Sequence, residues 1–225
     1  MGEAFDLEIS ATIDTEVDVP WNSRVTVFIF HRHRVIGKKT LRDSYIIPDE
    51  NNKVRIRLES LKIRNLKAFE AFFRNMMPKD GITQEEEVSL CVTAALDHDN
   101  NGHEFSIAID LDHISKLSVD CLDFQRCDES VRISFNMLSP SPVDLDFGHC
   151  RFILRKGKET LAFLDGYLII QQGHYEIDLE GDIDRGVDRK LFAGTGTLAG
   201  FKTHEHNNSF LAHAIRLFEI QVKLK

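Results

Sequence analysis

The string that most resembles a metal-binding loop is Asp97-x-Asp99-x-Asn101-Gly102, which matches the first six positions of a calcium-binding EF-hand loop. Such a loop needs a bidentate glutamate at its twelfth position, because about seven oxygens surround the calcium ion. Ala108 occupies that position here, and strand-like rather than helical segments flank the string. The sequence therefore favours a polar hairpin turn and leaves a calcium site as the alternative.

Two other polar strings could hold a cation. Asp182, Asp184 and Asp188 alternate within one acidic loop, where mutual repulsion would favour a bound cation or full solvation. His204-Glu205-His206 would place two imidazoles on one face of a strand, but no third ligand follows at a defined spacing. We expect a solvated loop and surface histidines, with a partial metal site as the alternative in each case.

The main functional signal is a concentration of positive charge in the N-terminal half. Residues 24–79 contain 14 Lys or Arg against five Asp or Glu, a net charge of +9, whereas the rest of the chain carries −17. Such segregation predicts a basic surface for an anionic lipid membrane or a protein partner. The overall net charge of −8 argues against nucleic-acid binding. The residues predicted to form the basic surface are Arg32, Arg34, Lys38, Lys39, Arg55, Arg57, Lys62 and Arg64.

Strand alternation would present this basic surface. Arg55 and Arg57 alternate with apolar residues in segment 54–58, so both are expected to project from one strand face into water. Residues 32–39 are interpreted as a link that an antiparallel fold could bring close to that strand. His31 and His33 lie beside this link, and we expect surface histidines, with a pH-responsive surface as the alternative. An ordinary charged sheet face is the alternative for the whole basic surface.

Enzyme signatures are missing from the sequence. It contains no Gly-x-Ser-x-Gly, no Gly-x-x-x-x-Gly-Lys, no His-Glu-x-x-His and no Cys-x-x-Cys. No catalytic or cofactor-binding residue is therefore assigned, no cofactor is expected, and the four cysteines are expected to be free thiols. The sequence favours a non-enzymatic binding or stress-protective module. The alternative is an enzyme or small-ligand carrier that uses a sandwich interior or a cleft between units.

Most of the chain has the period of β-strands. Alternating apolar runs rich in β-branched and aromatic residues are separated by turn residues, a pattern typical of antiparallel sandwiches and barrels. These runs are 25–30, 54–58, 88–92, 105–109, 131–134, 150–154, 167–170, 175–179 and 220–224. Only 65–77 and 208–218 have helical spacing, with apolar stripes at Leu66, Phe69, Phe73 and Met76, and at Leu211, Ile215 and Phe218.

The two halves repeat one another in order. Segments 24–30, 43–48 and 54–59 match 150–154, 165–170 and 175–180, and a helix with a closing strand follows in each half. The second half adds a strand candidate at 190–198. We predict an all-β chain of two tandem antiparallel β-sandwich units, residues 1–117 and 118–225, each with one short helix. An arrestin-like two-sandwich adaptor is the alternative.

Segment 139–147, Ser-Pro-Ser-Pro-Val-Asp-Leu-Asp-Phe, resembles the opening strand of the late-embryogenesis-abundant group-two domain, also called the water-stress and hypersensitive-response domain. Segments 165–168 and 176–181 fit its later strands, and the helix and final strand of 208–224 are similar to a fungal branch of unknown function. The first half departs from this pattern at 19–23. The resemblance implies a non-enzymatic β-sandwich that binds lipid, a membrane surface or a protein, or protects under stress.

The sequence also gives an expectation for location. It has no run of about 20 apolar residues and no basic-then-apolar leader, so a soluble chain is expected, cytoplasmic by default. The fungal branch that the chain resembles is often anchored in the vacuolar membrane with tandem units in the lumen. A vacuolar lumen location is therefore what the resemblance implies.

Overall fold

The computed structural model describes residues 4–12, 19–46, 53–78, 88–97, 104–114, 117–140, 144–204 and 210–224. The fold is all-β, as predicted, because antiparallel strands make up most of the described chain. The strands are β1 (Ala4–Thr12), β2 (Val19–His31), β3 (Arg34–Ile46), β4 (Lys53–Lys62), β5 (Val88–Asp97), β6 (Glu104–Ile114), β7 (Ser118–Cys127), β8 (Ser130–Ser139), β9 (Leu145–Lys156), β10 (Glu159–Ile170), β11 (Gly173–Asp182), β12 (Gly194–Thr203) and β13 (Glu219–Leu224).

The chain forms two units, and the N-terminal unit comprises Met1–Phe69 and Ser89–Asp112. Within it, four strands form a sheet in the order β3-β2-β5-β6, and β1 pairs with β4 in a second sheet. Val27 and Ile29 of β2 are buried while the residues between and beside them are half-buried, as alternation requires. One bridge, between Gly37 and Ile63, connects β3 to the end of β4.

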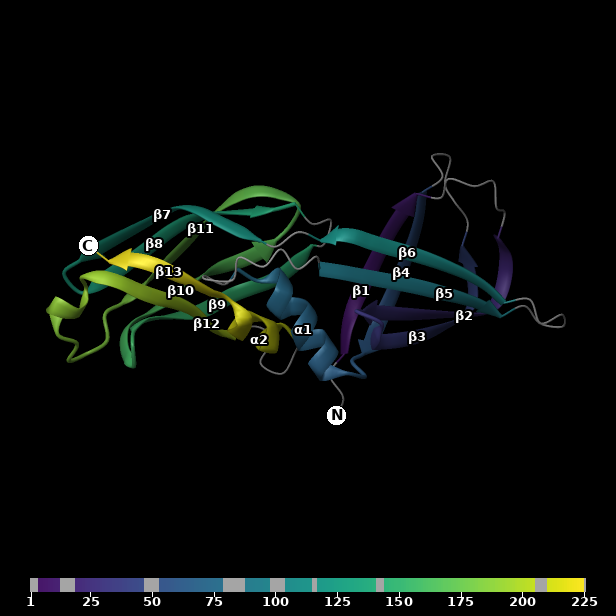
Figure 1. Ribbon diagram of the computed structural model, residues 1–225, viewed down its shortest axis with the longest axis horizontal. Coiled ribbons are helices and arrows are strands. Elements are labelled where there is room, and N and C mark those ends of the chain that lie inside the picture. The colour runs from purple at the N-terminus through teal and green to yellow at the C-terminus, as the bar shows by residue number, and fades with distance from the viewer. Residues whose placement is uncertain are drawn as a thin grey trace. The chain divides into compact units, whose positions relative to one another are not determined.

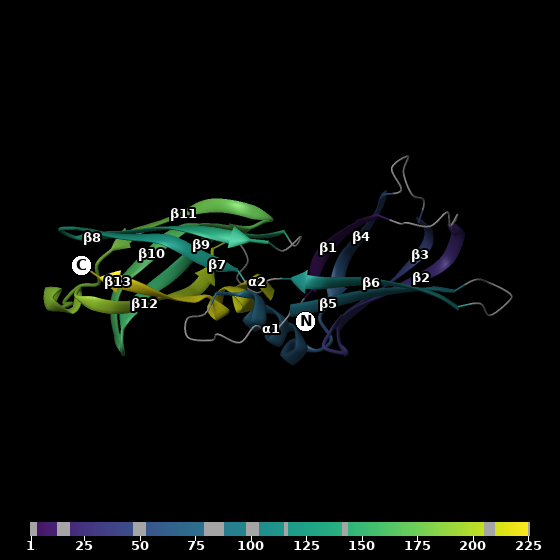
Figure 2. The same cartoon turned by 45° about the horizontal axis from the view of Figure 1, so that its top comes forward.

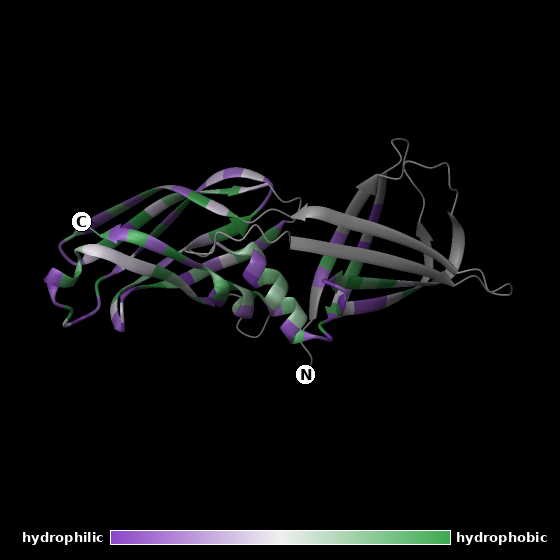
Figure 3. Ribbon diagram, viewed as in Figure 1, coloured by the Kyte–Doolittle hydropathy of each residue, from purple (hydrophilic) through white to green (hydrophobic). Residues whose placement is uncertain are grey.

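The C-terminal unit comprises Glu70–Val88 and His113–Lys225. Its seven described strands form one antiparallel sheet in the order β13-β12-β9-β10-β11-β8-β7. The sheet curls until its edge strands β13 and β7 contact one another (Figures 1 and 2). Apolar and polar residues alternate along these strands (Figure 3), and the inward side chains include the fully buried phenylalanines Phe135, Phe147, Phe152 and Phe218. A continuous apolar core therefore fills the curl.

The first helix, α1 (Leu66–Met76), begins at the predicted cap. The Asn65 side chain accepts a hydrogen bond of 3.0 Å from the backbone N–H of Ala68, which satisfies one of the free amides of the first turn. The predicted stripe is confirmed at Phe69, Phe73 and Met76, which are all buried. It is wrong for Leu66, the first residue of the helix, which is 40% exposed.

The second helix is shorter than predicted. Helix α2 (Phe210–Ala214) continues only as the 3₁₀ turn η2 (Ile215–Leu217), and Phe218 is already extended, with ψ of 124°. Leu211, Ile215 and Phe218 are nevertheless buried, as the stripe predicted. Its predicted cap at residues 208–209 lies outside the described residues.

Strands with mixed or charged sequences differ most from the prediction. β1 and β7 were not predicted, and the supposed basic link at 32–39 is mostly the start of β3. The predicted strand at 190–198 begins instead with a 3₁₀ turn, η1 (Arg189–Leu191), before β12. The predicted domain boundary between residues 117 and 118 stays a prediction. No described helix combines the length and the apolar character needed to cross a membrane.

Candidate functional site

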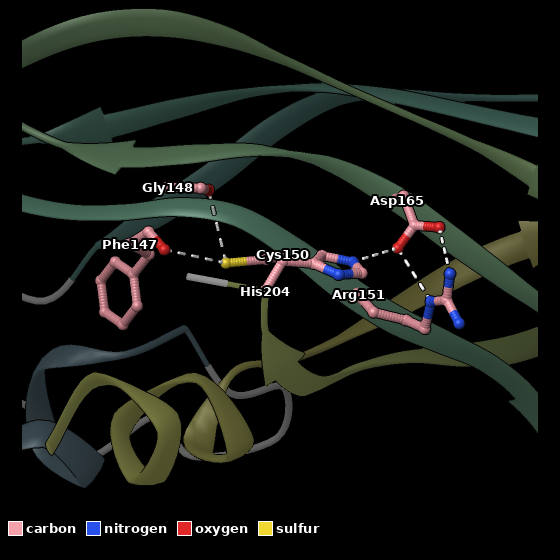
Figure 4. A network of polar contacts seen from close by, with 6 residues as sticks. All are labelled: Phe147, Gly148, Cys150, Arg151, Asp165 and His204. Atoms are coloured by element: carbon pink, nitrogen blue, oxygen red, sulfur yellow. Dashed lines mark hydrogen bonds and ion pairs between the residues drawn. The ribbon is translucent and has the colours of Figure 1, made fainter. Parts of the chain in front are cut away.

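A network of charged side chains lies on three neighbouring strands of the C-terminal sheet. Arg151 of β9 stands directly opposite Asp165 of β10 in the strand register. Its guanidinium group donates two hydrogen bonds to the Asp165 carboxylate, Nε to Oδ1 at 2.9 Å and Nη2 to Oδ2 at 2.7 Å. His204, just after β12, adds a contact of 2.9 Å from Nε2 to Oδ1 (Figure 4). Sheet pairing thus joins residues that are far apart in the sequence.

The Arg151 guanidinium group keeps the Asp165 carboxylate ionised. Its hydrogen bonds lower the pKa of Asp165, burial opposes this shift, and the hydrogen bond from His204 lowers the pKa further. The same pair raises the pKa of Arg151. The arrangement is therefore a preformed Arg151–Asp165 ion pair, and the His204 imidazole is hydrogen-bonded to the Asp165 carboxylate.

The Asp165–His204 pair resembles part of a catalytic triad, but the third member is missing among the described residues of the network. The nearest thiol, Cys150, is fully buried, and its Sγ lies 3.6 Å from the carbonyl oxygens of Phe147 and Gly148 (Figure 4). Cys150 adjoins Arg151 on the same strand and so points to the opposite face of the sheet. Among the described residues of the network, no nucleophilic side chain therefore contacts the His204 imidazole.

The Arg151–Asp165 pair should make part of the stability of this unit depend on pH. Because the folded-state pKa of Asp165 is lowered, the pair stabilises the fold above the unfolded pKa of about 4. That contribution is lost as the pH falls through the lowered folded-state pKa. When the pH is lowered from neutral to acidic, we expect the free energy of unfolding to fall less in Asp165→Asn than in the parent. Urea unfolding across this pH range measures the difference.

Asp182→Asn is the control for this pH series, since it removes an exposed carboxylate at the end of β11, outside the network. Its pH dependence should follow the parent. Equal slopes for Asp165→Asn and the parent would contradict the assigned role of the pair.

The structure describes only some of the residues of the three predicted cation sites. The EF-hand-like string lies outside the described residues after Asp97, and so does His206. In the acidic loop, Asp184 accepts a hydrogen bond from the backbone of Arg185, and Asp188 accepts one from that of Lys190. These carboxylates cap the loop backbone. Within the described ranges, no three or more His, Cys, Asp or Glu residues are grouped to hold a metal ion.

Two expectations about histidine and cysteine can be tested directly. The expectation of a surface histidine is wrong for His31, which is 2% exposed because it ends β2 on the buried face, whereas His33 is exposed in the next turn. Cys127 and Cys150 are free thiols, as expected.

The predicted basic residues divide into two groups, and the first is neutralised locally. Arg55 and Arg57 are exposed on β4. Arg55 pairs with Glu8 of the neighbouring β1 at 3.1 Å, and Arg57 with Glu59 at 3.7 Å. Their charge is therefore compensated on the surface of the β1–β4 sheet.

The second group surrounds the β2–β3 hairpin. Arg32 and His33 form its two-residue turn, with φ values of 47° and 62°, the left-handed pair found in a type I′ turn. Arg34 follows at the start of β3. Further along, the Lys38 ammonium lies 5.8 Å from the ring centroid of Phe28, which stacks on Phe30. The hairpin thus combines exposed positive charge with half-buried aromatic rings.

The Gly37–Ile63 bridge adds two more basic residues to the hairpin. The backbone N–H of Arg64 donates to the carbonyl of Ile36 at 2.8 Å, and Lys38 and Lys62 each adjoin a residue of the bridge. Lys39 stands opposite the buried Val27 instead, and so belongs to the other face of β3. We call the remaining group the basic cluster: Arg32, Arg34, Lys38, Lys62 and Arg64.

Comparison with known proteins adds no family assignment. No protein-family model matches the chain, and no curated protein matches it. The geometry of the described residues therefore carries the functional argument.

Proposed function

We propose that this protein is a non-enzymatic binding module that engages an anionic lipid surface through the basic cluster. The observation that carries the proposal is the absence of acidic residues from the segments that form the cluster. Residues 24–42 and 60–69 contain no Asp or Glu, and the Gly37–Ile63 bridge holds these segments side by side. Positive charge is thus concentrated in both segments.

The arrangement of the cluster suits a membrane surface. Like charges gathered in one region repel one another, so the positive charges of the basic cluster favour a ligand that supplies negative charge. Each Lys or Arg near an anionic leaflet contributes about 1 kcal/mol, and five such residues give useful affinity. Phe28 and Phe30, on the same hairpin, provide apolar surface for the interface between lipid headgroups and water.

The kinship with late-embryogenesis-abundant group-two domains, and a stress-protective role, form part of the same proposal. The all-β fold is compatible with both. An enzyme or small-ligand carrier finds less support, because phenylalanines fill the core of the C-terminal unit and its Asp165–His204 pair has no bonded nucleophile among the described residues.

The proposal is tested by co-sedimentation with vesicles of phosphatidylcholine that contain phosphatidylserine, compared with vesicles of phosphatidylcholine alone. The parent should bind only the anionic vesicles, and added salt should release it because salt screens exposed charges. The triple variant Arg32→Gln, Arg34→Gln, Lys62→Gln should bind about 100-fold more weakly, at about 1 kcal/mol for each charge removed.

A matched control removes the same charge elsewhere. Lys158, Lys190 and Lys223 are exposed in the C-terminal unit, and their triple replacement by Gln should leave vesicle binding close to that of the parent. Failure of the parent to bind anionic vesicles at low salt would overturn the proposal. An equal loss of vesicle binding in both triple variants would show that binding depends on net charge and not on the basic cluster.

A further inference from the structure

Aromatic side chains are exposed together on the outer face of the C-terminal sheet. Phe163 and Tyr167 of β10 are 37% and 45% exposed, and Phe201 of β12 is 41% exposed. Strand β9 lies between β10 and β12 in the sheet, so the three rings belong to one continuous surface. Single exposed aromatics are common, but a group on one face of a sheet marks a candidate interaction surface.

The strand register fixes the direction of these side chains. On β10, Phe163, Asp165 and Tyr167 alternate with the buried Leu164 and Leu168, so the first three point outward. The Phe163 and Phe201 ring centroids lie 6.3 Å apart. Phe163 and Tyr167 are four residues apart on one strand, a distance of about 13 Å.

The Arg151–Asp165–His204 network lies between the two aromatic positions. Tyr167, at the far end, donates a hydrogen bond of 2.7 Å to the Asp146 carboxylate and packs edge-on against His149, with ring centroids 5.4 Å apart. We call this surface the outer strip: Phe163, Phe201, Arg151, Asp165, His204 and Tyr167. It presents apolar rings at both ends and fixed hydrogen-bonding groups in the middle.

The outer strip and its border carry a small net charge. Arg151 and Asp165 neutralise each other, and Asp146 beside Tyr167 and the half-buried Lys202, opposite Arg151 in the register, add one charge of each sign. Glu180 of β11, exposed and opposite Asp165 in the register, adds one negative charge at the border. Such a surface does not attract a phosphate-rich ligand, and one unpaired carboxylate is a weak attraction for a strongly basic peptide. It suits a neutral ligand that has both apolar faces and many hydroxyl groups.

Sugars have these two properties. The C–H groups on one face of a pyranose ring pack against the electron-rich face of an aromatic ring. Its hydroxyl groups accept hydrogen bonds from guanidinium or imidazole groups and donate them to a carboxylate. The distance between Phe163 and Tyr167 exceeds the size of one sugar ring, so the ligand would be a chain rather than a monosaccharide.

We propose that the outer strip binds a neutral polysaccharide chain, with Phe163 and Phe201 stacked on one sugar ring, Tyr167 on another, and the Arg151–Asp165–His204 network bonded to the hydroxyl groups between them. This site belongs to the C-terminal unit and does not depend on the basic cluster.

Electrophoresis of the full chain in native gels that contain a soluble neutral polysaccharide tests the proposal, with separate gels for a glucan, a mannan, a xylan and a galactan. The parent should be retarded by at least one of them. Phe201→Ala should weaken this binding about 10-fold, and Phe163→Ala, Phe201→Ala together should weaken it further, because each removes a stacking surface. Both side chains are exposed, so the variants should keep the far-UV circular dichroism of the parent.

Leu138→Ala is the matched control, since Leu138 is also exposed, at 43%, but lies on β8. Its retardation should equal that of the parent. Mobility unchanged in all four gels would overturn the proposal, as would equal retardation of the parent and the double variant. Binding to neutral phosphatidylcholine vesicles that the double variant loses would assign the rings to lipid instead. The triple variant of the basic cluster should retain polysaccharide binding, which separates this test from that of the proposed function.

Discussion

Replacing Gly181 by alanine is expected to lower the free energy of unfolding of the C-terminal unit by about 3 kcal/mol or more. Gly181 lies on β11, where this strand passes very close to β10. A Cβ atom at this position would overlap the carbonyl oxygen of Phe163 and lie 2.8 Å from the Cα atom of Leu164. Both are backbone atoms, so no side-chain rotation can relieve the overlap, and the two strands must separate.

Amide hydrogen exchange, followed by mass spectrometry in peptides from β10 and β11, measures this effect where it arises. Gly157→Ala is the control, because Gly157 has a φ of +60° but no atom within 4 Å of the added Cβ. It should lose only about 1 kcal/mol through backbone strain. If Gly181→Ala lowers the free energy of unfolding by no more than Gly157→Ala does, then β10 and β11 do not approach one another as closely as described.

Strand alternation explains how much of this fold could be predicted. In β8 the buried positions are Val131, Ile133, Phe135, Met137 and Ser139, and all but the last are apolar in the sequence as well. A strand of this kind can be read directly, because one face is apolar and the other polar. The first helix could be predicted for a similar reason, since the stripe and the Asn65 cap agree.

Strands β3 and β7 show why the rest could not be predicted. The start of β3 has Gly37, Lys38 and Lys39 in succession, and β7 contains Asp120 and Asp123. Both sequences are typical of loops when read alone. Neighbouring strands hold these segments in place through backbone hydrogen bonds, which a sequence pattern does not reveal.

The same distinction applies to the candidate sites. The sequence identified Arg55 as basic, but not that Glu8, 47 positions earlier, would neutralise it, because cross-strand partners depend on register. The sequence predicts surface histidines at His204 and His206, with a partial metal site as the alternative, whereas the structure gives His204 a partner in Asp165 on another strand. Phe163 and Tyr167 do give a signal for the outer strip in the sequence, because they alternate with leucines at positions where a solvent-facing strand would normally be polar.

Replacing Phe218 by alanine is the second change expected to have a large effect, a loss of about 3–5 kcal/mol of unfolding free energy in the C-terminal unit. Phe218 is fully buried where η2 meets β13. Its ring centroid lies 5.4 Å from that of Phe152, edge to face, and 6.0 Å from that of Phe135. Removing the ring would leave a cavity between β8 and β9 and would also eliminate both aromatic contacts.

Phe218→Leu separates the cavity from the hydrophobic contribution, because it refills most of the space and should lose clearly less than the alanine variant. Leu138→Ala, at an exposed position of β8, should change stability by less than about 1 kcal/mol. Hydrogen exchange of the backbone amides of β8 and β9 measures the stability of the C-terminal unit in all three variants. If Phe218→Ala were as stable as Leu138→Ala, the packing of Phe218 against Phe135 of β8 and Phe152 of β9 could not contribute to the stability of the curled sheet.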